Sequence, residues 1–314
     1  MSERQISVVM SVWNARETLG RAVESILGQS FGGWEFLIVN DGSDDGSGGL
    51  LEEFARRDSR IRLVRQKNAG LTRALVHGCA EARGEWIARQ DADDWSESSR
   101  LEKCLALAGE HPGCTMVGSW ADYHGPAGEL LEVVRRPENP EEATRGLLHG
   151  EMGPPAHGTL MFRNAAYQKA GGYRQEFYFG QDLDLWLRMG QEGSLSYVQE
   201  SLYHYVLSPG AISGRFSGAQ NRFGELARLC LKAREEGGSE KLFLEEAEKL
   251  SAEARQNKAL GSPASQAGSN YRIGVRLARR GDRAAASRYF LEALRLQPMH
   301  WRALLRLLAS KIPR

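Results

Sequence analysis

The sequence is poor in cysteine and lacks long apolar runs. It has four cysteines in 314 residues and no Cys-x-x-Cys pair, which argues against a zinc site and against the disulfide framework of a secreted protein. No apolar run approaches the ~18 residues that span a bilayer, and the first residues carry no signal-peptide pattern. We therefore expect a cytoplasmic protein.

Positive charge is scarce in most of the chain and concentrated near its end. The net charge is +1, but the residues from Gln256 onward carry twelve Lys or Arg against Asp282 and Glu292, which leaves +10 there and −9 elsewhere. Two interpretations stay open. The basic end meets an anionic surface such as phospholipid headgroups, or it is a solvated helical face that balances an acidic neighbouring domain. We expect no nucleic acid partner.

Short β-branched runs alternate with amphipathic segments through the first hundred residues. Apolar runs typical of strands buried on both faces of a sheet lie at residues 6–12, 36–39, 61–64 and 85–89. Apolar residues at helical spacing separate them, around residues 19–27, 50–57 and 71–82. This alternation predicts βαβ units, and therefore an α/β fold with a doubly wound, mostly parallel sheet.

The sequence beyond residue 215 predicts helices only. We expect one α/β domain over residues 1–215 and an all-helical extension over residues 216–314, with a weak point at residues 257–270. Near residues 267–300 the extension resembles a tetratricopeptide-like helical pair, whose small and aromatic positions are Gly274, Gly281, Ala286, Phe290, Ala293 and Pro298. One such repeat cannot bury its own face, so it must pack on neighbouring helices or on a partner.

The last predicted helix has an apolar stripe beside basic side chains. The stripe consists of Trp301, Leu304, Leu305, Leu307 and Leu308. It can close the helical repeat by packing on Phe290 and Leu294, or it can lie in a membrane interface. We expect the stripe to pack on the repeat, and the charged face alone to dock on an anionic membrane.

Acidic residues follow two of the predicted strands directly. The run Asn40-Asp41-Gly42-Ser43 ends the second strand, and Asp91-Ala92-Asp93-Asp94 ends the fourth. Open α/β sheets bind ligands along the edge formed by the carboxyl ends of their strands. Three carboxylates in four residues repel one another, and bound Mg²⁺ or Mn²⁺ is the usual remedy. Capping of the following helix is the alternative, but a cap requires only one aspartate.

Four ordered runs of the sequence together indicate a family. They are SVVMSVWN at residues 7–14, VNDGS at 39–43, GEWIARQDADD at 84–94 and GQDLDLW at 180–186. In order, spacing and strand-end placement they resemble the signature series of family 2 glycosyltransferases, over roughly residues 4–213. The resemblance implies the GT-A fold, a nucleotide-sugar donor that is UDP-linked in many members, and inversion at the anomeric carbon.

The resemblance places the donor at the first two strand ends and at the acidic run. It implies that Asp41 hydrogen-bonds the nucleotide base, that Asp91 faces the ribose, and that Asp93, with Asp94 as the alternate, holds the metal that bridges the diphosphate. Trp13 is expected to be a stacking surface, with core packing as the alternative. The full donor-side set is Ser11, Trp13, Asn14, Asp41, Asp91 and Asp93.

The resemblance places the acceptor nearer the later motif. A carboxylate on the opposite face of the sugar can act as general base for one in-line displacement, and we assign this role to Asp182, for which helix capping is the alternative. Asp184 and Trp186 are expected on the acceptor side, with Asp184 orienting the site or pairing with Arg188 at i+4. His157 is expected to face the acceptor, with a hydrogen-bonded loop histidine as the alternative.

The chain departs from the family pattern at two places. Gln181 stands where the family has a glutamate, so the first carboxylate of that pair is absent. Val206 and Ser208 stand where many relatives carry an arginine and a histidine. A phosphate contact or an additional metal ligand from that loop is therefore not expected here.

The function predicted from these residues is metal-dependent transfer of a hexose to an acceptor hydroxyl. The resemblance implies a saccharide or lipid-linked saccharide acceptor, and therefore surface polysaccharide or glycolipid synthesis. Docking of the basic end would place the protein at the inner membrane face. Intact Asp41, Asp93 and Asp182 argue against the alternative of a helical scaffold with a vestigial catalytic domain. A sugar nucleotidyltransferase would have a Gly-rich loop after the first strand, and a dinucleotide oxidoreductase would have G-x-G-x-x-G there. The chain has neither.

Overall fold

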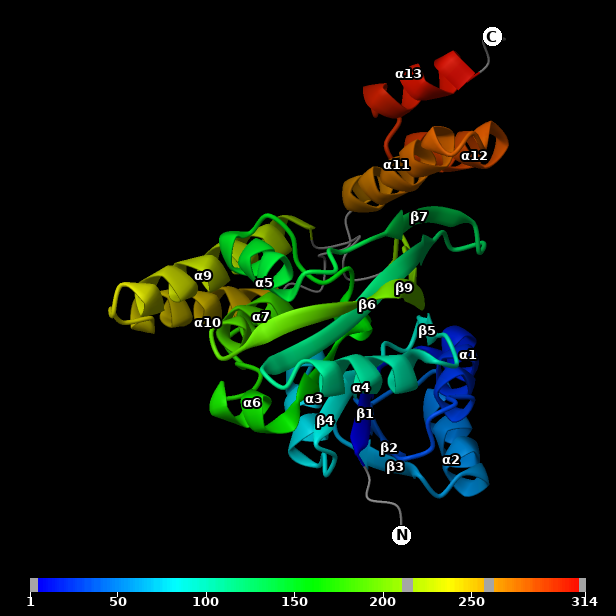
Figure 1. Cartoon of the computed structure of the whole chain (residues 1–314). Helices are drawn as coiled ribbons and strands as arrows, with labels where there is room; N and C mark the ends of the chain where they lie inside the picture. Colours follow the sequence, from blue (N-terminus) through cyan, green and yellow to red (C-terminus); the bar gives the residue numbers. More distant parts are fainter. Residues whose placement is uncertain (1–4, 211–216, 257–262, 311–314) are drawn as a thin grey trace.

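The computed structural model describes residues 5–210, 217–256 and 263–310. The expected domain boundary at residues 215 and 216, and the first part of the weak point at residues 257–262, lie outside these ranges. A nine-stranded sheet runs through the molecule in the order β3-β2-β1-β4-β8-β6-β9-β5, with β7 beside β6 (Figure 1).

The first half of the sheet is parallel. Its strands are β1 (Ile6–Val12), β2 (Trp34–Asn40), β3 (Ile61–Arg65) and β4 (Trp86–Arg89). They are connected by the helices α1 (Arg16–Leu27), α2 (Ser47–Arg57) and α3 (Leu71–Ala80). All four residues of β4 and six of the seven in β1 are buried, as expected for strands that are covered on both faces. The predicted α/β class is confirmed.

Beyond β4 the sheet becomes mixed. Strand β8 (Met161–Arg163) is antiparallel to both β4 and β6 (Cys114–His124), whereas β9 (Ser194–Val206) is parallel to β6. The short β5 (Trp95–Ser96) and β7 (Leu130–Val134) form the remaining antiparallel pairs, with β9 and β6. Helices α4 (Arg100–Glu110), α5 (Pro140–His149), α6 (Asn164–Lys169) and α7 (Gln181–Gly190) cover this half.

The first two helices of the extension belong to the α/β body. Helices α9 (Ser217–Glu235) and α10 (Lys241–Gln256) place Phe223, Leu226 and Ala247 in the same buried cluster as Leu185 and Trp186 of α7. Two helices that share this core cannot be removed without exposing it. The helical extension is therefore not one independent unit.

The last three helices form a separate layer. Helices α11 (Pro263–Arg279), α12 (Arg283–Leu296) and α13 (Trp301–Ser310) surround their own buried cluster, which reaches Leu131 of β7. An ion pair of 3.0 Å from Arg276 to Glu132 and a hydrogen bond of 3.1 Å from the Tyr289 hydroxyl to Glu129 also join this layer to the β7 hairpin. In Figure 1 the layer stands apart from α9 and α10, beyond β7.

The expectation that the stripe of α13 packs on the repeat is wrong for most of its members. Trp301 is 62% exposed and Leu305 is 56% exposed, and Leu304 and Leu308 are similarly exposed. The helix is rotated so that Ala303, which is fully buried, and Leu307 enter the cluster instead. Within the described ranges, no helix is long and apolar enough to cross a membrane.

The contact between α11 and α12 yields a stability prediction. A Cβ at Gly274 would lie 2.6 Å from Phe290 Cε1. The helices α11 and α12 can therefore pack this closely only because residue 274 has no side chain. Alanine normally stabilises a helix by about 1 kcal/mol relative to glycine. We expect Gly274→Ala to destabilise the layer by about 1–3 kcal/mol instead, because a tightly packed contact is overfilled.

Gly268→Ala is the matched control in the same helix. A Cβ there would meet only the Arg272 side chain, at 3.7 Å, so the ordinary gain in helix propensity should be seen. Denaturation followed by circular dichroism compares the two variants. Equal shifts in the same direction would contradict the close contact.

Candidate active site

The carboxyl ends of the parallel strands bring the predicted motifs to one edge of the sheet. Strand β1 pairs with β2 from Ile6 to Val12 and with β4 from Ile6 to Val9. Trp13, Asp41 and the run Asp91–Asp94 follow these strands directly. The edge expected from the sequence to bind a ligand is therefore where these side chains gather.

A buried arginine holds the first carboxylate of the acidic run. Arg89, at the end of β4, is fully buried and donates from Nη2 to Asp91 Oδ1 at 2.7 Å. Its Nη1 donates to the carbonyl oxygens of Val9 and Gln90. The Asp91 carboxylate remains about a quarter exposed. One of its oxygens faces the protein, and Oδ2 has no protein donor among the described residues.

The other two carboxylates of the run differ in what surrounds them. Asp94 is fully buried, and its two oxygens accept from the Tyr203 hydroxyl at 2.9 Å and from the Val206 amide at 2.8 Å. Asp93 is half-buried. Burial, with the nearby Asp91 charge, raises the pKa of Asp93 to about 6. Burial and a neighbouring charge favour a bound cation at Asp93, whereas both oxygens of Asp94 accept hydrogen bonds from β9. The metal ligands Asp93 and Asp94 remain predictions.

Asp41 is occupied by its own loop. It is 1% exposed, and its oxygens accept from the side-chain amide of Gln66 and from the backbone amides of Ala69 and Gly70, at 2.7–2.9 Å. The aspartate thus fixes the loop between β3 and α3. Direct contact with a base remains a prediction, and it requires the base to share an oxygen with these donors or the loop to move.

The residues that follow β1 are accessible. Trp13 is 58% exposed, so the alternative of core packing is wrong and the indole face is open for stacking. Asn14 has a φ of +50°, a conformation that asparagine tolerates better than most residues. Its side chain bonds Asp44 in both directions, at 2.8 and 3.0 Å. Asn14 therefore shapes the turn, and Ser11 beside it is half-buried.

Asp182 lies at the start of α7, where the backbone amide of Leu183 donates to its Oδ1 at 2.8 Å. Burial raises the pKa of Asp182, and the Asp91 carboxylate raises it further, while Arg89 opposes both. Asp182 is therefore within electrostatic range of the acidic run, although more than eighty residues separate them in the sequence. A raised pKa brings the carboxylate closer to the operating pH, where a general base is most effective.

Asp184 has a structural environment. It is 1% exposed, and its oxygens accept from Arg188 at 2.6 Å and from Arg174 at 3.4 Å. The pairing with Arg188 expected from the i+4 spacing is confirmed. No carboxylate surface is left for an acceptor, so Asp184 fixes α7 and thereby the start of the helix that carries Asp182.

His157, Trp186 and a tyrosine that the sequence did not single out form an aromatic group. His157 Nε2 is 2.6 Å from the Tyr173 hydroxyl, and its ring meets Trp186 edge-on at 5.9 Å between centroids. Burial, with Arg89 nearby, holds the pKa of His157 well below its usual value, so the imidazole is neutral. The buried Trp186 Nε1 has no partner among the described residues.

Sequence reasoning missed the side chains that hold the acidic run in place. The Tyr203 hydroxyl donates to Asp94 and accepts from the Asp91 amide at 3.1 Å. It sits against Gly158, where a Cβ would lie 1.8 Å from that oxygen. Arg100 of α4 donates to the carbonyls of Arg89 and Gly158. The sequence offered one indirect signal that such partners exist: Arg89 ends a strand that is otherwise apolar, and three aspartates follow it.

A second polar group lies just outside this site. Asp122, His124 and His204 each present one ligand atom, and these atoms all lie within 4.8 Å of one another. The aspartates of the acidic run do not form such a group in the part of the chain that the structure describes. No sequence pattern connects the three residues, because His204 is eighty positions from His124.

The contrast between the two aspartates of α7 can be tested through stability. Asp184→Asn leaves Arg188 buried without its countercharge, and breaking such a pair costs about 3–5 kcal/mol. Asp182→Asn removes a carboxylate whose pKa is raised in the folded state, so its ionised form opposes folding at neutral pH. We expect urea unfolding at pH 7 to show a large loss for the first variant and no loss, or a small gain, for the second. Similar losses in both would contradict the assignment.

Comparisons with known proteins agree with this arrangement. Residues 7–171, more than half of the chain, match the family model described as Glycosyl transferase family 2. EpsE and EpsH of Bacillus subtilis, glycosyltransferases by name, are 37% and 28% identical over 208 and 222 residues. These stretches cover 63% and 69% of this chain, and 72% and 64% of the two relatives.

Solved structures match the fold over nearly the whole chain. S. aureus TarS 1–349 in complex with UDP is 14% identical, with a TM-score of 0.58 over 98% of this chain and 88% of that one. The same TarS fragment in complex with UDP-GlcNAc is 14% identical, with a TM-score of 0.57 over 98% and 89% of the two chains. The sequence motifs, the carboxylates at the sheet edge and these matches lead to one conclusion: the chain belongs to glycosyl transferase family 2 and has the GT-A fold.

Proposed function

We propose that this glycosyltransferase moves a hexose from a UDP-linked sugar to an acceptor hydroxyl, with inversion at the anomeric carbon. The observation that carries the proposal is the convergence of Asp91, Asp93 and Asp182 at one sheet edge. The pKa of Asp93 and that of Asp182 are raised in part by the charge of Asp91. Carboxylates with perturbed pKa values at a ligand-binding edge are typical of catalytic sites.

The donor side is supported by one accessible side chain after β1. The exposed Trp13 offers an aromatic face to a base. Asp41, directly after β2, fixes the neighbouring loop between β3 and α3 by accepting from the amides of Ala69 and Gly70. TarS, which shares the fold, binds UDP and UDP-GlcNAc in its structures. A UDP-sugar is therefore the donor that we propose.

Asp93 and the free side of Asp91 are the residues that would hold Mg²⁺ or Mn²⁺. They fit the ion because carboxylate oxygens are the ligands that these cations take, and because a carboxylate crowded by another gains from a bound cation. A divalent ion supplies stabilisation of the charge that develops on the departing diphosphate. Asp94 contributes by holding the acidic run against β9.

Asp182 is proposed as the base on the acceptor side. In its ionised form it takes the proton of the acceptor hydroxyl while that oxygen attacks the anomeric carbon. The bond from that carbon to the diphosphate oxygen breaks on the opposite face, which inverts the configuration. Burial of His157 keeps its imidazole neutral, and the neutral ring can orient the acceptor through a hydrogen bond. Trp186 Nε1, a buried donor, lies in the same group.

The variant Asp182→Asn tests the base. The amide keeps the shape of the side chain but cannot accept the proton, so we expect turnover to fall by about 10²–10⁴-fold with donor binding unchanged. Asp93→Ala is the comparison, because it should abolish metal-dependent donor binding itself. Calorimetric titration with UDP and Mn²⁺, together with a transfer or donor-hydrolysis assay, separates the two effects. Loss of UDP binding in Asp182→Asn would move this residue to the donor side.

The same assay discriminates the scaffold alternative. A vestigial catalytic domain would neither hydrolyse nor transfer from any of a panel of UDP-sugars, with Mn²⁺ present or absent. Slow donor hydrolysis that disappears in Asp182→Asn would support the enzyme.

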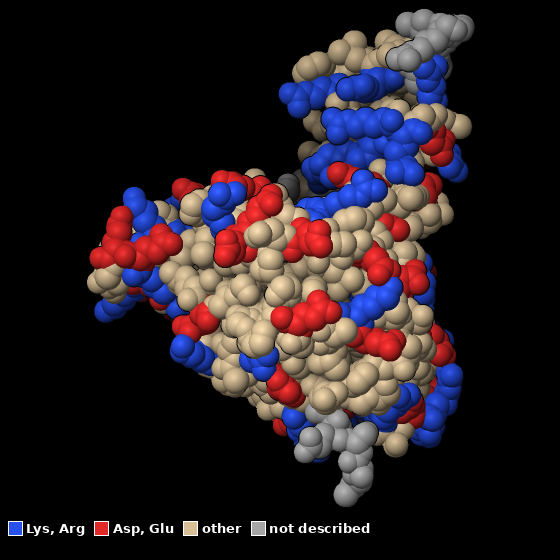
Figure 2. Space-filling view, in the orientation of Figure 1, with Lys and Arg blue, Asp and Glu red and all other residues tan. Residues whose placement is uncertain are grey.

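The basic end of the chain supports a further part of the proposal, peripheral docking on an anionic membrane. Figure 2 shows Lys and Arg gathered over the layer formed by α11–α13, in contrast to the mixed charge of the body. The exposed Trp301, Leu304, Leu305 and Leu308 lie on the same layer. Each basic residue near an anionic leaflet adds about 1 kcal/mol, and exposed apolar side chains can enter the interface. Such docking would bring the enzyme to a lipid-linked acceptor.

Sedimentation with liposomes tests the docking. We expect binding to vesicles that contain phosphatidylglycerol, none to pure phosphatidylcholine, and release by salt. The double variant Trp301→Ala, Leu305→Ala should weaken binding, whereas Leu242→Ala should not, although Leu242 on α10 is 74% exposed. Equal behaviour on both kinds of vesicle would contradict the proposal.

A further inference from the structure

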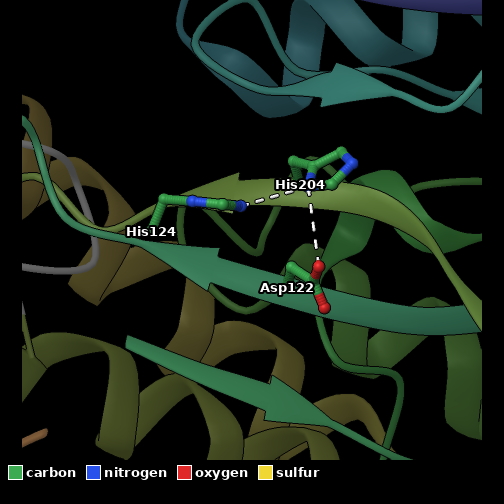
Figure 3. Close-up of side chains that lie close together, drawn as sticks. All are labelled: Asp122, His124 and His204. Atoms are coloured by element: carbon green, nitrogen blue, oxygen red, sulfur yellow. Dashed lines mark hydrogen bonds and ion pairs between the residues drawn. The ribbon is translucent and has the colours of Figure 1, made fainter. Parts of the chain in front are cut away.

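Two histidines and an aspartate meet near the ends of β6 and β9, beside the active site. Asp122 and His124 lie on β6, and His204 lies opposite Asp122 on the neighbouring β9. His124 Nε2 is 3.1 Å from His204 Nδ1, and Asp122 Oδ2 is 3.9 Å from the same nitrogen. Figure 3 shows the two side chains of β6 directed toward His204. Nothing in the proposed transfer reaction uses this group.

The hydrogen bonds around the group fix which atoms face its centre. Glu97 Oε1 lies 2.7 Å from His204 Nε2, and because a carboxylate accepts, the proton of this ring sits on Nε2. The other nitrogen of His124, Nδ1, faces the Gly128 carbonyl at 3.4 Å, which favours the proton on Nδ1 there. Two bare nitrogen lone pairs, His124 Nε2 and His204 Nδ1, are thus left facing each other.

The carboxylate is oriented in the same way. The Ser201 hydroxyl donates to Asp122 Oδ1 at 2.6 Å, and this bond turns Oδ2 toward His204. In these tautomers the two lone pairs and the carboxylate oxygen converge without a donor, and they repel one another. A cation among them removes the repulsion.

We propose that Asp122, His124 and His204 bind a transition-metal ion, with Zn²⁺ as the best fit, at a site separate from the catalytic carboxylates. Two imidazoles and one carboxylate suit Zn²⁺, whereas Mg²⁺ prefers an all-oxygen set. With Zn–N bonds of about 2.0–2.1 Å in a tetrahedral site, two nitrogen ligands lie about 3.3 Å apart. The observed 3.1 Å is close to that value. The lack of a cysteine pattern argued against a zinc site, but these ligands need no cysteine.

The surroundings of the three ligands are those of a built metal site. Glu97 on His204 and Ser201 on Asp122 are the outer hydrogen bonds that orient metal ligands. Trp95 stacks on His204 with centroids 4.6 Å apart and planes 8° from parallel, and it also contacts His124 at 4.8 Å. The two imidazoles are therefore held in place before an ion arrives, whereas Asp122 Oδ2, at 3.9 Å from His204 Nδ1, has to move closer to complete the set.

The position of Trp95 indicates what the ion would do. Trp95 follows Asp94 directly, and Arg21 lies over its ring at 3.8 Å while donating to the Asp93 carbonyl at 3.2 Å. An ion that fixes His124 and His204 also fixes Trp95 between them and Arg21. The three ligands are positioning residues that support the acidic run, and none of them touches the reacting atoms.

Metal binding by the full chain tests this site without relying on transfer activity. Protein stripped by a chelator is titrated with Co²⁺, whose visible absorption reports nitrogen coordination, and then with Zn²⁺ as competitor. We expect about one equivalent with a tetrahedral Co²⁺ spectrum, displaced by Zn²⁺. Both should be lost in His124→Ala and retained in Asp93→Ala, so that this site is distinguished from the catalytic one.

His149→Ala is the control for a single histidine, because His149 is exposed at the end of α5. Circular dichroism establishes that each variant is folded, and His124→Gln replaces His124→Ala if the latter does not fold. The spectrum must survive in His149→Ala. Wild-type protein that takes up no Co²⁺ at this stoichiometry, or an unchanged spectrum in both His124 variants, would overturn the proposal in favour of a proton shared by the two imidazoles.

Discussion

The buried guanidinium of Arg89 is the group on which the active site depends. A charge that is fully removed from water costs several kcal/mol unless it is paired and hydrogen-bonded. Here the pairing comes from Asp91 and from the carbonyls of Val9 and Gln90. The acidic run therefore has to turn inward at its first residue, against the end of β1. The same cation lowers the pKa of His157 and opposes the rise in that of Asp182. One buried arginine thus connects Asp91, His157 and Asp182, the residue that we propose as the base.

The site contains more carboxylates than the single guanidinium of Arg89 can neutralise. Burial and mutual repulsion raise the pKa values of Asp93, Asp94 and Asp182. Such carboxylates hold protons in the folded state at a pH where the unfolded chain has lost them. Their contribution to stability therefore falls as the pH rises from about 4 to the raised values. For Asp94 the Tyr203 hydroxyl and the Val206 amide offset part of the cost. In the described part of the chain, Asp93 has no such partner on another residue, and we therefore propose Asp93 as the cation ligand and Asp94 as the anchor.

The sequence was sufficient for the parts of the fold that depend on local pattern. The β-branched runs predicted β1 to β4, and the strand ends predicted where Trp13, Asp41 and Asp91 gather. The i+4 spacing predicted the pairing of Asp184 with Arg188. What it could not supply depends on contacts between distant residues. Tyr203 supports Asp94 only because β5 pairs with β9, and the apolar stripe of α13 does not decide which of its leucines face α12. Asp184 also accepts from Arg174 at 3.4 Å, and no periodicity describes the position of that arginine.

Strand β9 connects two polar groups: the acidic run Asp91–Asp94 and the cluster of Asp122, His124 and His204. Successive side chains point to opposite faces, so Tyr203 reaches Asp94 on one side while His204 faces Asp122 and His124 on the other. A slip of one residue would exchange these faces, removing the support of the acidic run and dispersing the histidine pair at once. The pairing of Trp95 with His204 and of Ser96 with Tyr203 fixes the register from the acidic run itself. An interaction that holds His204 on one face of β9 therefore also keeps Tyr203 against Asp94 on the other face. The two groups have no residue in common.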